Sequence, residues 1–466
     1  MDTSFPPGFA PDELCRLDAA ALQAAYRAGG LSPVEVTKAC LARAEEINPR
    51  FNAFTRIDHE GALAAARAAE ARWRAGAPLS DVDGVPATLK DIVWVKGWSV
   101  RYGSTTTDAA PYEEDAPAVA LLRQHGVVFI GQTTTPEFGW KAVTDSPAFG
   151  ITRNPHDPSK TSGGSSGGAA VAACVGAGVF HLGTDGGGSI RVPSAFCGIT
   201  GLKPTFGQVP AYPASAFGTV AHIGPMTRNA ADAMAMLKAM SGRDLRDWNQ
   251  GAGRFPALGL AERALKGLRV GYWSQPAAGA LDPQVRDIVA ARIAQLADLG
   301  VEVTPFKLPG EDLLELFHDH WFAGAAARLA SVPEARRGRI DPGFLEVARE
   351  GAAKDAVRLV QAQVRRASFG AAMDAALADY DFILSPGTAI PAFEAGVELP
   401  AGSGLKRWTE WAGFSFPINL TQQPAAVTPC GATEAGLPVA LQIIGARGDD
   451  SKVLSLAAAL EPLFAA

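Results

Sequence analysis

Cysteine and histidine are scarce in this sequence, and their scarcity excludes several kinds of site. The 466 residues include five cysteines and seven histidines, and none stands at the paired spacing that a metal site requires. The odd number of cysteines, mostly in apolar contexts, favours reduced core thiols over a disulfide framework. Phosphate-binding and dinucleotide-binding glycine motifs are absent as well. The sequence therefore predicts neither a metal nor a cofactor.

Basic charge and long apolar runs are also lacking. The formal net charge is −6, which disfavours a nucleic-acid partner, because such a partner would favour a basic face. No run of about 18 apolar residues is present that could cross a bilayer. Residues 1–7 lack the basic region and the apolar core of a signal peptide. We therefore expect a cytoplasmic protein with no nucleic-acid partner and no membrane partner.

Two glycine-rich clusters that contain serine are the most informative part of the sequence. They span residues 163–168 (GGSSGG) and 183–191 (GTDGGGSIR). A serine hydroxyl is a poor nucleophile near neutral pH, so it needs a base within hydrogen-bond reach and N–H donors for the oxyanion that forms after attack. The amides of residues 186–189 can converge on one anionic oxygen, because three of these four residues lack a Cβ atom.

Lys90 is the candidate base, since no histidine lies in or beside either cluster. It belongs to residues 84–93 (GVPATLKDIV), a pattern typical of a turn followed by a short apolar strand. An ordinary lysine has a pKa of about 10.4 and acts as a base near neutrality only if burial or cationic neighbours lower that pKa by several units. The apolar flanks of Lys90 favour such burial. Taken alone, such a residue would most often be a surface lysine whose stem covers apolar neighbours.

These residues together resemble the amidase signature family of serine hydrolases. The best match runs from Gly84 to about Thr205 and includes residues 194–205 (SAFCGITGLKPT). The spacings agree with the family too, with 75 residues from Lys90 to Ser165 and 24 from Ser165 to Ser189. Weaker matches lie nearer both ends of the chain, at residues 31–35, 224–228 and 436–442.

The resemblance implies a role for each residue of the two clusters. Ser189 would attack the amide carbonyl, Ser165 would relay protons, and unprotonated Lys90 would be the base. The relay serine would have a cis peptide bond to its neighbour, and Asp185 and Arg191 would brace the oxyanion turn. The oxyanion hole would consist of the backbone amides of Gly186, Gly187, Gly188 and Ser189. The partner would be a small-molecule amide substrate, and the resemblance allows a homodimer.

Composition and resemblance together predict one α/β domain. With 47% apolar and 19% charged residues, the chain can bury a large core. The resemblance implies a single domain over residues 1–466, with one large mixed central sheet covered by helices. Its parts would be a helical region at about 12–75, the signature core at about 81–205 and a C-terminal α/β remainder. Residues 241–254 are linker-like and would form a surface excursion.

Local patterns support the alternation of helices and strands. Residues 32–35 (SPVE) form a capping box that begins a helix, which we expect to stop at Asn48-Pro49. A second helix should begin at Asp282-Pro283 and end near Gly300. Strands flank this helix or lie further along the chain, at residues 268–272, 301–303, 381–386 and 439–444.

Two other interpretations of the first cluster are weaker. A GGSSGG segment alone is most often a flexible linker, but the following residues 169–175 (AAVAACV) are helix-forming and apolar. The same cluster formally satisfies the G-x-S-x-G elbow of α/β-hydrolases, which needs a buried strand directly before the serine. Residues 153–161 are polar and broken by proline, so we reject the elbow. The later histidines fit surface or structural roles better, at positions 181, 222, 318 and 320.

Two functions remain open. The first is a stand-alone amidase that forms an acyl-enzyme on Ser189 and releases ammonia or an amine. The second is the glutaminase subunit of a tRNA-dependent amidotransferase, which shares these motifs. Two departures count against it: Val192 stands where those proteins have glutamine, and their central tyrosine-containing basic segment has no counterpart. A non-catalytic binding protein would have little reason to keep Lys90, Ser165 and Ser189 together.

Aromatic residues are candidates for the substrate pocket. Phe138 and Trp140 lie at the family position that lines the acyl pocket, where they could hold an apolar or aromatic group, and ordinary core packing is the alternative for each. Trp408, Trp411 and Phe414 would form an entrance wall or cover the face of a helix.

Overall fold

One mixed β-sheet runs through the whole molecule in the computed structural model, which describes residues 5, 6, 8, 11–250 and 255–465. Within these residues the sheet has 11 strands in the order β1-β3-β2-β6-β8-β7-β12-β13-β11-β9-β10, and a separate hairpin pairs β4 with β5. The strands are β1 (Phe54–Ile57), β2 (Pro86–Lys90), β3 (Val128–Thr133), β4 (Asp145–Ser146), β5 (Gly150–Ile151), β6 (Phe180–Asp185), β7 (Thr200–Lys203), β8 (His222–Thr227), β9 (Arg269–Tyr272), β10 (Glu302–Pro305), β11 (Phe382–Pro386), β12 (Ala425–Ala432) and β13 (Pro438–Ile444). The expected α/β class with one large mixed sheet is confirmed.

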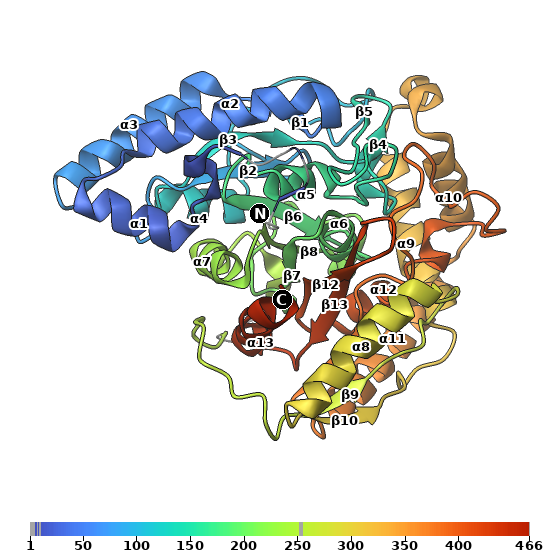
Figure 1. The fold of residues 1–466 in the computed structure, drawn as a ribbon. Helices are drawn as coiled ribbons and strands as arrows, with labels where there is room; N and C mark the ends of the chain where they lie inside the picture. The colour runs from blue at the N-terminus through green and yellow to red at the C-terminus, as the bar shows by residue number, and fades with distance from the viewer. Residues whose placement is uncertain (1–4, 7, 9–10, 251–254, 466) are drawn as a thin grey trace.

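Helices cover this sheet on both sides and at its ends. The α-helices are α1 (Ala19–Ala28), α2 (Pro33–Phe51), α3 (His59–Arg74), α4 (Pro117–Gln124), α5 (Gly167–Cys174), α6 (Arg191–Cys197), α7 (Ala230–Met240), α8 (Pro283–Asp298), α9 (Leu313–Ala330), α10 (Pro342–Ala352), α11 (Ala356–Leu377), α12 (Phe416–Thr421) and α13 (Asp450–Phe464). Short 3₁₀ helices are η1 (Glu13–Arg16), η2 (Glu137–Gly139), η3 (Gly218–Val220), η4 (Trp248–Gln250), η5 (Glu334–Arg339) and η6 (Trp408–Glu410). Figure 1 shows α1 to α3 gathered at the β1-β3-β2 end and α8 beside β9 and β10 at the other.

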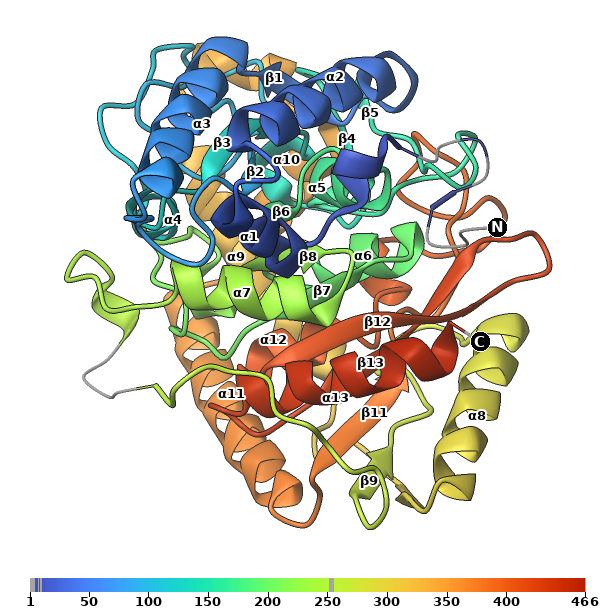
Figure 2. The same ribbon diagram turned by 60° about the vertical axis from the view of Figure 1, so that its left-hand side comes forward.

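The sheet changes strand direction where the two halves of the chain meet. Strands β3, β2 and β6 run parallel, as do β11, β9 and β10, whereas β6, β8, β7, β12, β13 and β11 pair antiparallel in succession. Figure 2 shows α7 and α13 side by side across the antiparallel middle. The parallel strands β2 and β6 therefore bring their carboxyl ends to one edge of the sheet, where residues 90 and 185 lie.

The capping box at the start of α2 is confirmed, but the expected end of this helix is wrong. Ser32 Oγ accepts a hydrogen bond from the amide of Val34, and the carboxylate of Glu35 accepts one from the amide of Ser32 at 2.8 Å. The helix continues past Pro49 to Phe51, where Asn52 (φ 52°) ends it by donating its amide to the carbonyl of Asn48. The helix goes only two residues beyond the proline before a left-handed residue terminates it.

The predicted βαβ unit is present in the second half of the chain. Asp282 caps α8 by accepting hydrogen bonds from the amides of Gln284 and Val285. Strands β9 and β10, which flank this helix, pair parallel, and their bounds differ from expectation by one or two residues. The described part of the linker-like stretch, residues 241–250, contains no buried residue, so it is a surface excursion there; residues 251–254 lie outside the described residues, as do 1–4 and 7 of the N-terminal segment.

Two large apolar cores support the sheet, and two smaller clusters accompany them among the described residues. The first lies beneath α1, α2, α7 and α13 and includes Leu22, Val36 and Leu89. The second is strongly aromatic, is built by α9 to α12 with η2, and includes Phe138, Phe317 and Trp321. In the described part of the chain, no helix is long and apolar enough to traverse a bilayer.

Candidate active site

Lys90 lies at the carboxyl end of β2 and is completely buried. Its Nζ lies 2.7 Å from Ser165 Oγ, 2.9 Å from Ser166 Oγ and 2.8 Å from Thr184 Oγ1. We call these four side chains the hydroxyl cluster. Thr184 comes from β6, the strand beside β2, and the two serines directly precede α5. The fold thus brings together Lys90 and Ser165, as the sequence predicts.

The surroundings of Lys90 favour its neutral form. Burial lowers the pKa of Lys90 well below its ordinary value, and the negative charge of Asp185 opposes that shift only in part. The hydroxyl of Ser166 donates to the carbonyl of Thr184, so its oxygen can accept from Lys90. A neutral amine has two N–H donors and one lone pair. A neutral amine that donates to Ser166 and Thr184 would have its lone pair free to accept from the hydroxyl of Ser165.

Ser189 lies in the turn between β6 and α6. The residue is 5% exposed and lines the same cavity as Ser165. Its carbonyl accepts a hydrogen bond from the amide of Ser166 at 3.1 Å, which ties the two glycine-rich clusters together. The peptide bond between Gly164 and Ser165 is cis, as the resemblance implies. No strand directly precedes Ser165 in the described chain, which agrees with the rejection of the hydrolase elbow.

The turn supplies fewer free amides than the sequence suggests. The amide of Gly188 donates to Asp185 Oδ1 at 2.8 Å, so this residue must be removed from the expected oxyanion hole. The amides of Gly186, Gly187 and Ser189 have no acceptor among the described residues. These three remain the candidates for an oxyanion site.

The three glycines of the turn are needed for two different reasons. Only Gly188 has a positive φ, of 128°. A Cβ atom at Gly186 would lie 2.8 Å from the ring of Trp321, and one at Gly187 would lie 2.7 Å from the ring of Trp408. Two of the glycines therefore allow aromatic rings to pack directly against the turn.

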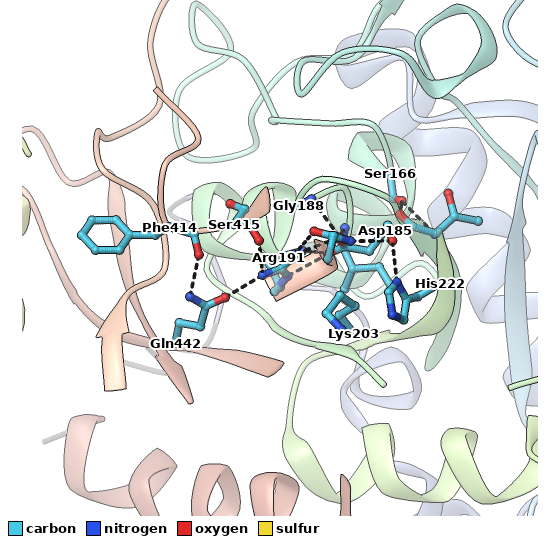
Figure 3. Close-up of polar contacts among 12 residues, drawn as sticks. Ser166, Asp185, Gly188, Arg191, Lys203, His222, Phe414, Ser415 and Gln442 are labelled. Atoms are coloured by element: carbon cyan, nitrogen blue, oxygen red, sulfur yellow. Dashed lines mark hydrogen bonds and ion pairs between the residues drawn. The ribbon is translucent and has the colours of Figure 1, made fainter. Parts of the chain in front are cut away.

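Asp185 and Arg191 form a fully buried ion pair beneath this turn (Figure 3). Arg191 Nε and Nη2 each lie 3.0 Å from a carboxylate oxygen of Asp185. The other three N–H groups of Arg191 donate to the carbonyl of Ser415, to Gln442 Oε1 and to Asn419 Oδ1. We call Asp185, Arg191, Asn419 and Gln442 the ionic clamp.

The ionic clamp holds its charges in place. Burial alone would raise the pKa of Asp185, but the charge of Arg191 and the hydrogen bonds from Arg191 and Asn419 outweigh burial and hold this pKa below its usual range. Because Gln442 and Asn419 belong to β13 and α12, the clamp ties the turn to the C-terminal half of the sheet. These contacts support the bracing role implied by the resemblance.

A cavity of about 860 Å³ opens above Ser165 and Ser189. Its wall is rich in aromatic side chains, namely Trp94, Tyr102, Tyr112, Phe138, Phe206, Tyr212, Phe217 and Trp321. Gly139 also lines it and passes close to Ser165, since a Cβ atom there would lie 3.3 Å from Ser165 Oγ. The site thus combines a polar floor with an apolar chamber large enough for a drug-sized molecule.

The sequence-predicted aromatic residues separate into two groups. Phe138 lines the cavity, whereas Trp140 does not: its ring packs against Phe344 and its carbonyl accepts from Trp321 Nε1 at 3.1 Å. Trp140 therefore supports the wall from behind. The three residues considered for an entrance wall are all buried and none lines the cavity, namely Trp408, Trp411 and Phe414.

Several side chains of the site have no role that the sequence alone predicts. Ser166 follows the predicted Ser165, and Thr184 precedes the predicted Asp185. Their position beside predicted residues is the one feature of the sequence that could have indicated them. Asn419 and Gln442 stand more than 200 residues from Arg191 in sequence and carry no signal. His222 is buried, lines the cavity and contacts the carbonyl of Val220 through Nδ1 at 2.8 Å. Among the described residues, no cluster of three or more potential metal ligands occurs.

Comparison with known proteins identifies a matching family model and relatives that cover most of the chain. The family model described as Amidase matches residues 35–454. A glutamyl-tRNA(Gln) amidotransferase subunit of Myxococcus xanthus is 34% identical over 481 residues, covering 94% of this chain and 96% of that protein. The acylamidase of Rhodococcus erythropolis is 32% identical over 453 residues, covering 96% and 95%. A solved structure described as an amidase superposes with a TM-score of 0.85 at 29% identity, covering 96% of this chain and 100% of the other.

Proposed function

This chain belongs to the amidase family, whose members are serine amidohydrolases that act on carbon–nitrogen bonds, and we propose that it hydrolyses small carboxylic acid amides without a partner protein. One observation carries the proposal. The buried amine of Lys90 lies 2.7 Å from Ser165 Oγ at the floor of a cavity into which Ser189 also opens. A base, a relay hydroxyl and a nucleophile therefore meet where an amide could bind.

The proposed reaction proceeds in two stages. Ser189 Oγ attacks the amide carbonyl while its proton passes to Ser165 Oγ and the proton of Ser165 passes to Lys90 Nζ. The amides of Gly186, Gly187 and Ser189 stabilise the negative charge on the tetrahedral intermediate. As this intermediate collapses, the C–N bond breaks and the leaving nitrogen takes a proton back through Ser165. Water then attacks the acyl-enzyme by the same relay and releases the acid and Ser189.

The cavity favours substrates with an apolar part. Aromatic side chains make up much of the wall, and Phe138 stands beside Gly139, which approaches the relay serine. Burying an aromatic group between such side chains contributes more than its area alone, by about 0.5–1.5 kcal/mol for a well-oriented ring pair. We therefore expect aromatic amides to be better substrates than acetamide.

The second candidate is a glutaminase subunit of a tRNA-dependent amidotransferase. The similarity to the protein of Myxococcus xanthus favours it, because that similarity is as extensive as the similarity to the acylamidase. Val192 and the missing tyrosine-containing segment count against it. This candidate predicts ammonia release from glutamine in the presence of partner proteins.

The decisive experiment measures ammonia or amine release by the purified chain alone. The panel contains acetamide, benzamide, acetanilide and glutamine, and Ser189→Ala is measured in parallel. Release from benzamide or acetanilide that disappears in the variant supports the stand-alone amidase. Release that persists in Ser189→Ala contradicts the proposal. No release from any of the four compounds, glutamine included, favours the second candidate, which acts with partner proteins.

A further inference from the structure

The cavity wall carries a cation that forms no direct ion pair with any carboxylate in the described part of the chain. Arg328 lies in the last turn of α9, is half-buried and lines the cavity. Among the described residues, no side chain or carbonyl accepts a hydrogen bond from its guanidinium. The other arginine of the wall, Arg336, differs: its Nη1 donates to Asp108 Oδ1 at 2.8 Å and to the carbonyl of Thr106 at 2.9 Å. Arg328 is thus the cation of this wall whose N–H groups remain available.

Two aromatic rings hold the guanidinium of Arg328. Its Cζ lies 4.5 Å from the ring centroid of Phe138 and 4.8 Å from that of Tyr102. Such cation–π contacts cover the faces of a guanidinium but leave its N–H edge free. That edge has the shape that binds a carboxylate through two parallel hydrogen bonds.

The two rings are placed by an unusual stretch of backbone. Tyr102 (φ 57°) and Phe138 (φ 54°) both have left-handed backbone angles, which are uncommon for aromatic residues. The amide of Phe138 donates to the carbonyl of Tyr102 at 2.7 Å, which joins the two segments. The buried carboxylate of Asp91 accepts hydrogen bonds from the amides of Arg101 and Gly103 and so holds the Tyr102 turn. Backbone strain of this kind is concentrated at functional sites.

The carboxylate of Glu137 does not neutralise Arg328 by a direct bond. Its Oε1 accepts from Ser104 Oγ at 2.5 Å and its Oε2 from the amide of Asp341 at 2.6 Å. Phe138, which lies beneath the guanidinium, directly precedes Gly139, and a Cβ atom on Gly139 would lie 3.3 Å from Ser165 Oγ. The unpaired cation is therefore close to the proposed reaction centre.

We propose that Arg328 is a specificity-determining residue and that this enzyme prefers amides whose apolar body carries a carboxylate, bound by the N–H edge of Arg328. The proposal rests on the proposed amidase function, since it names the substrate class of the same site. Arg328 touches the substrate away from the scissile bond, so its loss affects binding of the anionic substrate more than the chemical step.

The test compares 4-carbamoylbenzoate with its neutral analogue 4-acetylbenzamide. We expect the wild-type kcat/KM to be about 10- to 100-fold higher for the carboxylate. Arg328→Gln should remove this preference mainly by raising KM for 4-carbamoylbenzoate, with little change for 4-acetylbenzamide, and Arg328→Lys should keep part of it. The control is Arg349→Gln, which removes the same charge from an exposed position on α10. Equal kcat/KM values for the two substrates in the wild type, or a preference that survives Arg328→Gln, would overturn the inference.

A binding measurement separates this inference from the proposed function. Calorimetric titration of Ser189→Ala with 4-carbamoylbenzoate requires no turnover, and we expect about 10- to 100-fold weaker binding when Arg328→Gln is added. Hydrolysis of 4-acetylbenzamide without any effect of Arg328 on binding would overturn the inference and leave the amidase function standing. Binding that depends on Arg328 in a protein that hydrolyses no amide would support the role of Arg328 in binding the carboxylate and contradict the proposed amidase function.

Discussion

Two buried polar clusters lie side by side beneath the cavity, and they treat charge in opposite ways. The hydroxyl cluster surrounds Lys90 with three neutral oxygens and no carboxylate, so burial favours the unprotonated amine. The ionic clamp pairs Arg191 with Asp185 and satisfies every N–H of the guanidinium. A group that must accept a proton needs neighbours that tolerate both of its states, whereas a brace needs charges that never change. Substitutions and pH changes that act on one cluster at a time test this contrast.

Removing the base should have the largest effect on activity. Lys90→Ala should lower kcat for benzamide by about 10²- to 10⁴-fold, because general base catalysis contributes about that much. Lys90→Arg should be nearly as inactive, since a guanidinium keeps the charge but does not deprotonate. The exposed Lys96 provides the control, and Lys96→Ala should retain wild-type kcat. Substantial activity in Lys90→Arg would show that a neutral amine is not required.

Breaking the ionic clamp should lower stability rather than alter a proton transfer. Arg191→Met leaves Asp185 buried without its countercharge, which should cost about 3–5 kcal/mol in the free energy of unfolding. Urea denaturation of the variant measures this loss. The double variant Asp185→Asn/Arg191→Met should recover part of it, because no unpaired charge remains. A double variant less stable than the single one would contradict the assigned role.

The two clusters should also respond differently to pH. The rate should fall about tenfold per pH unit on the acid side as Lys90 becomes protonated. The residual activity of Lys90→Ala should lack this acid-side decrease.

The ionic clamp should affect stability instead. It stabilises the folded state above the ordinary carboxyl pKa of about 3.9, because the pKa of Asp185 is depressed in the folded state. This stabilisation is lost as the pH falls below that value. Initial rates and denaturation midpoints over the same pH series would distinguish the two. An acid limb that persists in Lys90→Ala would remove Lys90 from the mechanism.

The smallest effect is expected within the hydroxyl cluster itself. Ser166→Ala removes one of the two oxygens that orient the N–H groups of Lys90, while Thr184 Oγ1 still holds the amine. We expect kcat to fall by about tenfold or less, since one hydrogen bond contributes about 1 kcal/mol. Thr184→Val is the matched variant and should give a similar decrease. A loss as large as that of Lys90→Ala would mean that Ser166 itself takes part in proton transfer.

Much of the site is predictable because its residues lie in short, distinctive segments. Lys90, Ser165 and Ser189 stand in motifs whose spacing matches the family, and the structure brings Lys90 within 2.7 Å of Ser165. Gly188 does not fit the role expected for it, because its amide binds Asp185, whereas the oxyanion role of Gly186, Gly187 and Ser189 stays a prediction. Local sequence shows which residues can form a tight turn, but it does not show which amide a neighbouring carboxylate will occupy.

Other features depend on contacts that the local pattern does not show. The position of Trp140 behind the wall follows from α10, because Phe344 packs against its ring. The expected end of α2 is wrong because the helix tolerates Pro49 in its last turn. It ends three residues later, at Asn52, which has a left-handed backbone conformation. Arg328 gives no signal in the sequence, since its place over Tyr102 and Phe138 results from the packing of α9 against two separate loops.

The α/β class, the glycine-rich turn and the choice of Lys90, Ser165 and Ser189 as candidate catalytic residues follow from the amino-acid sequence, because they depend on local periodicity, residue type and short motifs that resemble the amidase family. The protonation preference of Lys90, the partners of Arg191 and the shape of the cavity arise only in the folded chain. These properties depend on burial and on groups separated by as many as 251 residues along the chain. Desolvation and hydrogen bonding act through space, so they emerge only when the strands and helices are assembled.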